Sequence, residues 1–300
     1  MRGIALNREP GWHFAGNFLR ISFDSITPDD ARLSLVGGPH CNDREGRVNV
    51  GAVAMLADMA LASAIRAMLP PETRLATVNM HLQLTGHAAE GRLHASGRFQ
   101  GFVPDSRGQL GLAAVALAGD AGPVGFGTGS FMALEPPQGV VMHPLPMRTA
   151  DSPPPPAIAR DALTADEKRV LQRAGKALAS MSHGDFLSSF WGYAPRPAIH
   201  GARCTLENGA HVGNRVGHAQ GGILMGLAAV TAEAALPASW RLASITACYV
   251  SPGVGARLTA RSTVVHRGRF TAVVSTEVRG AERKRVLEVL TTHAAAKSSL

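Results

Sequence analysis

The sequence predicts an α+β fold in which one structural unit occurs twice in 300 residues. Three observations predict it. Two Ala-rich apolar segments have the length of a helix, each is followed by a series of short strand-like segments, and a proline-rich stretch separates the halves. Repeats of about 20–50 residues would indicate a solenoid, and the unit here is far longer. We therefore expect two similar domains rather than a repeat array.

The two predicted helices cover Val50 to Leu69 and Gly222 to Leu236, and each stops before a proline. Their sequences, AVAMLADMALASAI and GILMGLAAVTAEAAL, are apolar on nearly every face. A helix of this kind must be buried nearly all round. An antiparallel sheet that curls around it satisfies that requirement. We therefore expect two long central α-helices wrapped by a continuous antiparallel β-sheet.

Four strands are predicted after each helix. The first strands are RLATVNMHLQLTG from Arg74 and RLASITACYVSPG from Arg241, and both end at Gly. The remaining strands, joined by hairpin-like turns, are Arg92–Gly101, Gln109–Ala118 and Pro123–Leu134 in the first half, and Ala256–His266, Arg269–Arg279 and Lys284–Ala294 in the second.

A connector is predicted between the halves, because residues 136–156 hold eight prolines, four of them consecutive. Proline lacks the amide donor of a strand ladder and stiffens the chain. The expected divisions are an N-terminal domain over 1–137, a linker over 138–162 and a C-terminal domain over 163–300. A leading helix is expected from Leu163 to Ser182, since Thr164 and Glu167 form a capping-box pattern.

The composition argues against several classes of protein. The three cysteines are widely separated, so neither a disulfide framework nor a zinc site is expected, and no metal is predicted. No apolar run approaches the roughly 18 residues of a membrane span. The first residues lack the apolar stretch of a signal peptide. A soluble cytoplasmic protein is therefore expected.

The positive charge is confined to the second half. Residues 1–140 have a balance of −1 and residues 141–300 a balance of +9, which gives the net +8. A basic half suits nucleic acid or a polyanionic small molecule. The longest basic block is only Arg283-Lys284-Arg285, and no aromatic nucleic-acid motif accompanies it. We therefore expect no nucleic-acid partner.

The start of each predicted helix resembles the PaaI-like acyl-CoA thioesterases of the hotdog fold. In that family an Asn and a Gly precede His-Gly-Gly, and an acidic residue follows nine positions after the His. The corresponding residues are Asn42, Gly46, Asn49-Val50-Gly51 and Asp58 in the first half, and Asn214, Gly217, Gln220-Gly221-Gly222 and Ala229 in the second. The resemblance covers roughly residues 17–135 and 186–295, and implies a tandem, or double, hotdog.

The resemblance implies hydrolysis of an acyl-CoA thioester to a free acid and CoA, without a cofactor. Asp58 would be the general base or the nucleophile. Burial would raise its pKa, whereas an Asp at an exposed helix edge would be merely solvated. The amides of Gly51 and Gly222 would form an oxyanion hole at the helix starts, beside the Asn49 and Gln220 side chains.

Strand hydroxyls at Thr77 and Ser244 match positions that orient water in related thioesterases, although both could be ordinary strand residues. Either could work with Asp58, the first within its own half and the second across the internal interface. The second site has Ala229 in place of the acid, and Glu233, one turn further on, is either a substitute or a solvated helix residue. One competent and one degenerate site are therefore expected.

The phosphates of CoA need Arg or Lys. The turn around His266, Arg267 and Arg269, together with Arg107, is the predicted CoA-binding patch, and the alternative is a solvated turn. Exposed sheet edges favour a homo-oligomer, such as a dimer of double hotdogs. The rival function is a non-catalytic acyl-CoA-binding or regulatory hotdog protein. A hotdog hydratase or dehydratase is disfavoured, because Ser63 stands where a hydratase has His.

Overall fold

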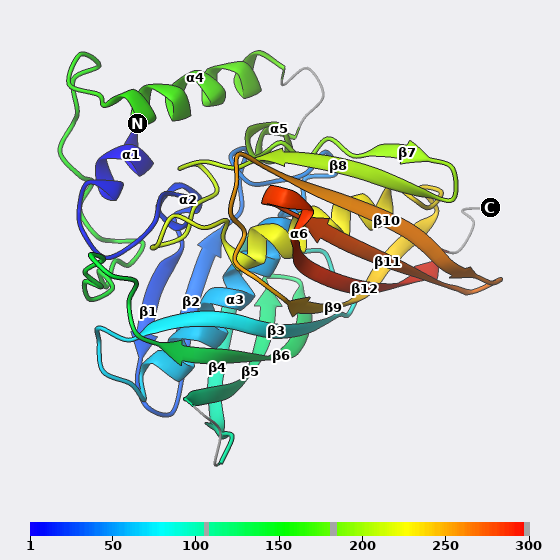
Figure 1. Ribbon diagram of the computed structural model, residues 1–300, viewed down its shortest axis with the longest axis horizontal. Coiled ribbons are helices and arrows are strands. Elements are labelled where there is room, and N and C mark those ends of the chain that lie inside the picture. The colour runs from blue at the N-terminus through cyan, green and yellow to red at the C-terminus, as the bar shows by residue number, and fades with distance from the viewer. Residues whose placement is uncertain (105–107, 181–184, 297–300) are drawn as a thin grey trace.

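One antiparallel sheet of twelve strands passes through both halves of the computed structural model, which describes residues 1–104, 108–180 and 185–296. The strand order is β1-β2-β4-β5-β6-β3-β9-β12-β11-β10-β8-β7, with the first half on one side and the second half on the other (Figure 1). The strands are β1 Ser22–Ile26, β2 Ala31–Val36, β3 Arg74–Leu84, β4 Arg92–Phe102, β5 Gln109–Gly119, β6 Gly122–Leu134, β7 Arg196–Ala198, β8 Gly201–Glu207, β9 Trp240–Tyr249, β10 Arg257–Arg267, β11 Thr271–Arg279 and β12 Arg285–Ala295.

The two halves join where β3 pairs with β9. Met80 lies opposite Ala247, and the ladder extends to Asn79 and Gln83 on either side. These two strands contain the matching sequences that start at Arg74 and Arg241, so equivalent strands of the two repeated units pair with each other. The predicted α+β class with a continuous antiparallel sheet is therefore observed.

Two buried helices, α3 (Val50–Arg66) and α6 (Gly221–Glu233), pack against the sheet and against each other. Their backbones approach closely: a Cβ added at Gly222 would lie 2.4 Å from the Met55 Cα, and one at Gly226 would lie 2.5 Å from the Gly51 Cα. Only glycine allows such an approach. The start of each helix therefore lies against the middle of the other.

Both helices end three residues before the predicted ends at Leu69 and Leu236. The last residues instead form single turns, in which the Leu69 amide donates to the Arg66 carbonyl and the Leu236 amide to the Glu233 carbonyl. Helix α4 (Ala165–Ala179) begins with the predicted capping box of Thr164 and Glu167. Residues 181 and 182 of that prediction lie outside the described residues.

Three short helices were not predicted: α1 (Arg2–Asn7), α2 (Phe14–Leu19) and α5 (Phe186–Trp191). Helices α2 and α5 meet through aromatic rings, and the tilted rings of Phe18 and Phe190 have their centroids 4.8 Å apart. The stretches FAGNFL and FLSSFW share their Phe spacing, so the repeated unit includes this short helix. Helices of about six residues lack the periodicity on which sequence prediction depends.

The connector follows the surface of the first half. The Phe23 amide donates to the Arg148 carbonyl (2.8 Å), Met142 is buried, and Arg8 forms an ion pair with Glu167 (2.8 Å) at the start of α4. The Arg215 side chain donates to the His143 carbonyl, which ties the connector to the second half. This stretch therefore covers part of the boundary between the halves.

Candidate active site

Asp58 lies on α3 among apolar side chains and is only 4% exposed. Thr77 Oγ1 on β3 donates to Asp58 Oδ1 (3.1 Å), and Gln220 Nε2 donates to Asp58 Oδ2 (2.5 Å). The orientation of the Gln220 amide is fixed, because its Oε1 accepts from the Ile223 amide (2.9 Å). The carboxyl group of the first half is thus held by the residue that begins α6 of the second half.

Burial raises the pKa of Asp58 to about 7, against the opposing effects of hydrogen bonds from Thr77, Gln220 and the Gly222 amide. Desolvation disfavours the charged carboxylate, and the three donors favour it. The group therefore changes its protonation state close to neutral pH, where a general base is most useful.

The start of α6 presents backbone to this carboxyl group. A Cβ added at Gly221 would lie 3.1 Å from Thr77 Oγ1 and 3.4 Å from Asp58 Oδ1. Tyr249 holds this turn, because its hydroxyl donates to the Gly221 carbonyl (2.8 Å). Free amides at a helix start favour negative charge. The Gly222 amide already donates to Asp58, so a carbonyl oxygen can approach this turn at Gly221, which lines the cavity.

A cavity of about 370 Å³ opens at this point. Its polar wall includes Asp58, Thr77 and Gln220, and an apolar wall adjoins it. The apolar side chains come from both halves and the connector: Met59, Leu75, Phe131, Leu134, Met142, Leu145 and Leu224. The lining also includes three arginines, at 66, 74 and 215, and the sequence interpretation missed all three. Arginines near a helix end, at the start of a strand or in a loop look solvated from sequence, so no local signal could have identified them.

Asn49 and Gly51 do not lie in this cavity, contrary to their expected grouping with Asp58. Asn49 Oδ1 accepts from the Gly51 amide (2.9 Å), and Asn49 Nδ2 donates to Ser188 Oγ (3.0 Å) on α5. The reason is the way the helices cross: the start of α3 faces α6, and the start of α6 faces Asp58. The second expected group is divided in the same way, because Gln220 and Gly222 serve Asp58 rather than Glu233.

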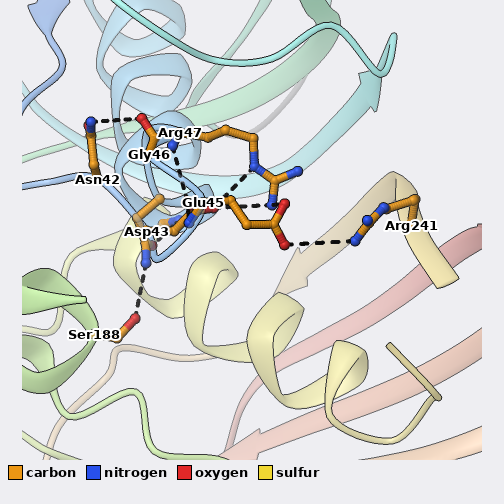
Figure 2. Close-up of polar contacts among 9 residues, drawn as sticks. Asn42, Asp43, Glu45, Gly46, Arg47, Ser188 and Arg241 are labelled. Atoms are coloured by element: carbon orange, nitrogen blue, oxygen red, sulfur yellow. Dashed lines mark hydrogen bonds and ion pairs between the residues drawn. The ribbon is translucent and has the colours of Figure 1, made fainter. Parts of the chain in front are cut away.

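The expected equivalence of Asn42 and Asn214 is also wrong. Asn214 Oδ1 accepts from the amides of Val216 and His218, both at 3.0 Å. In the first half Asp43 makes this arrangement, because its Oδ1 accepts from the Glu45 and Arg47 amides (2.8 and 3.0 Å; Figure 2). Asn42 instead ties the preceding turn, by accepting from the Gly38 amide and donating to the Gly46 carbonyl. Asn42 and Asn214 thus shape loops, although Asn214 also lines the cavity.

The region equivalent to the Asp58 site in the other half is filled. A Cβ added at Gly51 would lie 2.9 Å from Tyr193 Cε2 and 3.0 Å from Trp191 Cζ3. Tyr193 donates its hydroxyl to the Ile223 carbonyl (2.5 Å), and Trp191 is fully buried. At the start of α3, Val50 stands at the position that Gly221 has at the start of α6, so a side chain is present where α6 has none. Aromatic rings thus occupy the space over the α3 start.

Glu233 is exposed at the end of α6, and the charged side chains of Asp43, Glu45, Arg47 and Arg241 surround it. Figure 2 shows the ion pairs of Glu45 with Arg47 (2.8 Å) and with Arg241 (4.0 Å). Ser244 lies on β9 opposite Gln83 and does not line the cavity. Of the two predicted hydroxyls, the structure therefore brings only Thr77 to Asp58.

The predicted CoA-binding residues are exposed: His266 and Arg267 end β10, and Arg269 lies in the turn to β11. Arg269 stacks over the ring of Phe270, with Cζ 5.0 Å from its centroid. None of the three lines the cavity. Arg107 lies outside the described residues. The structure thus gives this group of residues no common site with Asp58.

Among residues 1–104, 108–180 and 185–296, no cluster of His, Cys, Asp and Glu could hold a metal ion. None of the helices described there has the length and apolar character to cross a membrane.

Known proteins match both the sequence and the fold. The family model described as the acyl-CoA thioesterase N-terminal domain matches residues 211–295. A search of curated protein sequences finds no match. Residues 211–295 are therefore similar to an acyl-CoA thioesterase domain, in agreement with the predicted class of enzyme, a thioester hydrolase.

Solved structures resemble almost the whole chain. A Lactobacillus plantarum protein described as an oleoyl thioesterase aligns with a TM-score of 0.56 and 10% identity over 90% of this chain and 96% of that one. A tesB protein of Mycobacterium avium subspecies paratuberculosis gives 0.51 and 10%, over 92% and 96%. A Thermobifida fusca protein described as thioesterase II gives 0.51 and 14%, over 93% and 96%. The fold is that of the double-hotdog proteins, as predicted, and together with the match over residues 211–295 it agrees with the predicted hotdog thioesterase resemblance, whereas the PaaI-like subtype is not confirmed.

Proposed function

We propose that the chain hydrolyses an acyl-CoA thioester to a free acid and CoA at a single site shared between its halves. The observation that carries the proposal is the buried Asp58 carboxyl group, held by Gln220 at the start of α6 and open to a cavity. Helices α3 and α6 would be the two central helices of the double hotdog. Asp58, Thr77 and Gln220 would form the site with the Gly221 and Gly222 backbone.

In this mechanism the thioester carbonyl oxygen lies beside Gly221 at the start of α6, where the Gly221 amide and the positive end of the helix dipole stabilise the negative charge that develops on it. Asp58 removes a proton from a water molecule held by Thr77, and the water oxygen bonds to the carbonyl carbon. The tetrahedral intermediate then breaks its C–S bond and releases CoA as a thiolate, which takes up a proton. Alternatively, Asp58 attacks the carbon directly, and water hydrolyses the resulting anhydride. Both routes require the ionised carboxylate.

The test is release of free thiol from a panel of acyl-CoAs that vary in chain length and aromatic content, followed with a thiol-reactive chromophore. We expect release from at least one member at a rate proportional to protein concentration. Binding of acyl-CoA without thiol release on every member would overturn the hydrolase and indicate an acyl-CoA-binding protein.

The dependence of kcat/KM on pH should follow Asp58. The carboxyl group is protonated below its pKa of about 7, so kcat/KM should rise roughly tenfold per pH unit below that value and level off above it. Thr77→Val removes a donor that lowers this pKa, and its profile should therefore shift to higher pH. Thr77→Ser, which keeps the hydroxyl, is the matched control. A profile that is flat from pH 5 to 9 would contradict this assignment.

A further inference from the structure

The charged groups that line the cavity are strongly unbalanced. Arg66, Arg74 and Arg215 line it, and Asp58 is its single carboxyl group among the described residues. None of the ion pairs found among those residues involves any of the three arginines. Because the Asp58 pKa is raised by burial, this carboxyl group is not a full counter-charge either. The three arginines and Asp58 therefore give the cavity a net positive charge.

Arg215 is the arginine of the cavity that most clearly lacks an anionic partner. It lies in the loop before α6 and is half-buried. Its Nη2 donates to the His143 carbonyl of the connector, while its Nη1 is buried without any hydrogen-bond partner. A buried guanidinium donor without a partner is costly, and such groups normally meet a carboxylate or phosphate. The unmet donor indicates a ligand that supplies the acceptor.

Arg66 supplies the second positive group. It follows Asp58 by eight residues on α3, which places it about 12 Å further along the helix axis. Its Nη1 donates to the Thr73 carbonyl (2.8 Å), and burial together with the charge of Arg215 lowers its pKa to about 10. The two guanidinium groups therefore repel each other across the cavity, and an anion between them would relieve that repulsion.

We infer that Arg215 and Arg66 form an anion-binding end of the cavity that holds a carboxylate or phosphate group of the substrate. The inference rests on the proposed function, since it names a property of the molecule bound at the Asp58 site. Apolar side chains such as Met59, Leu75 and Phe131 also line the cavity. An anionic group on the acyl chain would therefore be separated from the thioester carbonyl by an apolar spacer.

The anion has two possible sources, and the assay separates them. Glutaryl-CoA and valeryl-CoA have acyl chains of equal length and differ in the terminal carboxylate. The glutaryl and valeryl thioesters of pantetheine lack the phosphates of CoA. The four substrates are compared for wild type, Arg215→Leu, Arg66→Leu and the exposed control Arg196→Leu, which lies outside the cavity.

We expect Arg215→Leu to lower kcat/KM by roughly 10- to 100-fold, mainly through KM, and only for substrates that carry the bound anion. A loss confined to glutaryl thioesters identifies an acyl carboxylate. A loss on both CoA esters that spares both pantetheine thioesters identifies a CoA phosphate. Arg66→Leu should follow the same pattern, and Arg215→Lys should restore part of the loss. An equal loss on all four substrates, or none, overturns the anion site.

Direct binding keeps this result separate from the proposed hydrolysis. Calorimetry with the non-hydrolysable thioether S-(4-carboxybutyl)-CoA and its S-pentyl and pantetheine counterparts reports the anion site without any turnover. If the wild type binds these compounds but hydrolyses no thioester, the hydrolase is wrong, while an affinity loss in Arg215→Leu on the anionic compounds alone still supports the anion site. Equal affinities of wild type and variant for every compound would overturn it.

Discussion

Replacing Asp58 with Asn is expected to lower kcat/KM for thioester hydrolysis by roughly 10²- to 10⁴-fold. An amide can neither accept a proton from water at neutral pH nor attack the carbonyl carbon, so both proposed routes fail. The substitution should preserve the site geometry, because an amide oxygen can accept from Gln220 Nε2 and an amide nitrogen can donate to Thr77 Oγ1. The measurement is thiol release at pH 8 on the best acyl-CoA substrate.

Stability provides the internal control for this substitution. The folded-state pKa of Asp58, about 7, lies above the ordinary value of 3.8, so between these values the folded protein binds more protons than the unfolded chain. The free energy of unfolding therefore falls as pH rises through this window, by at most about 4 kcal/mol. Asp58→Asn removes that loss and should raise the thermal midpoint at pH 8 but not at pH 4.

Asp151→Asn, at an exposed position of the connector, is the matched control and should change neither activity nor midpoint. An active Asp58→Asn variant would eliminate the carboxylate from the mechanism. A variant that is inactive and also less stable at pH 8 would indicate that the loss comes from a damaged fold.

The sequence allowed the local features of the fold to be predicted. The repeat around Arg74 and Arg241, the buried helices and the capping box at Thr164 each depend on residues close together in the chain. Asp58 could be identified as a candidate because a lone carboxyl group in an apolar helix is costly. Its partner could not be assigned, because Asn49 and Gln220 have the same relation to their own helices.

The choice between those two partners depends on how α3 and α6 cross. The contact of Gly222 with Met55 joins residues that are far apart in the sequence, and no periodic pattern in the sequence predicts that contact.

The loop before α3 shows a second limit of prediction from the sequence. Asn42 and Asn214 look alike because each precedes a Gly by a few residues, yet it is Asp43 that lies six residues before its helix cap, as Asn214 does. The equivalent residue of the loop is therefore found from its spacing to the helix cap and not from the residue type.

Trp191→Ala should give the largest loss of stability, a fall of roughly 3–5 kcal/mol in the free energy of unfolding. Trp191 is fully buried, and its ring lies over Gly51 at the start of α3, where the second half would otherwise complete a site. Removing it leaves a cavity between α5 and α3. The measurement is the denaturant midpoint at constant m-value.

Ser188→Ala on the same short helix is the matched control, because it removes only the hydroxyl that accepts from Asn49 and should cost about 1 kcal/mol. The position equivalent to Asp58 in α6 is Ala229, so Trp191→Ala should open space without creating a second hydrolytic site. Calorimetry with a thioether analogue should therefore give one ligand per chain in the wild type. Two equal binding sites in the wild type, or an unchanged midpoint in Trp191→Ala, would show that the aromatic rings do not fill the second site.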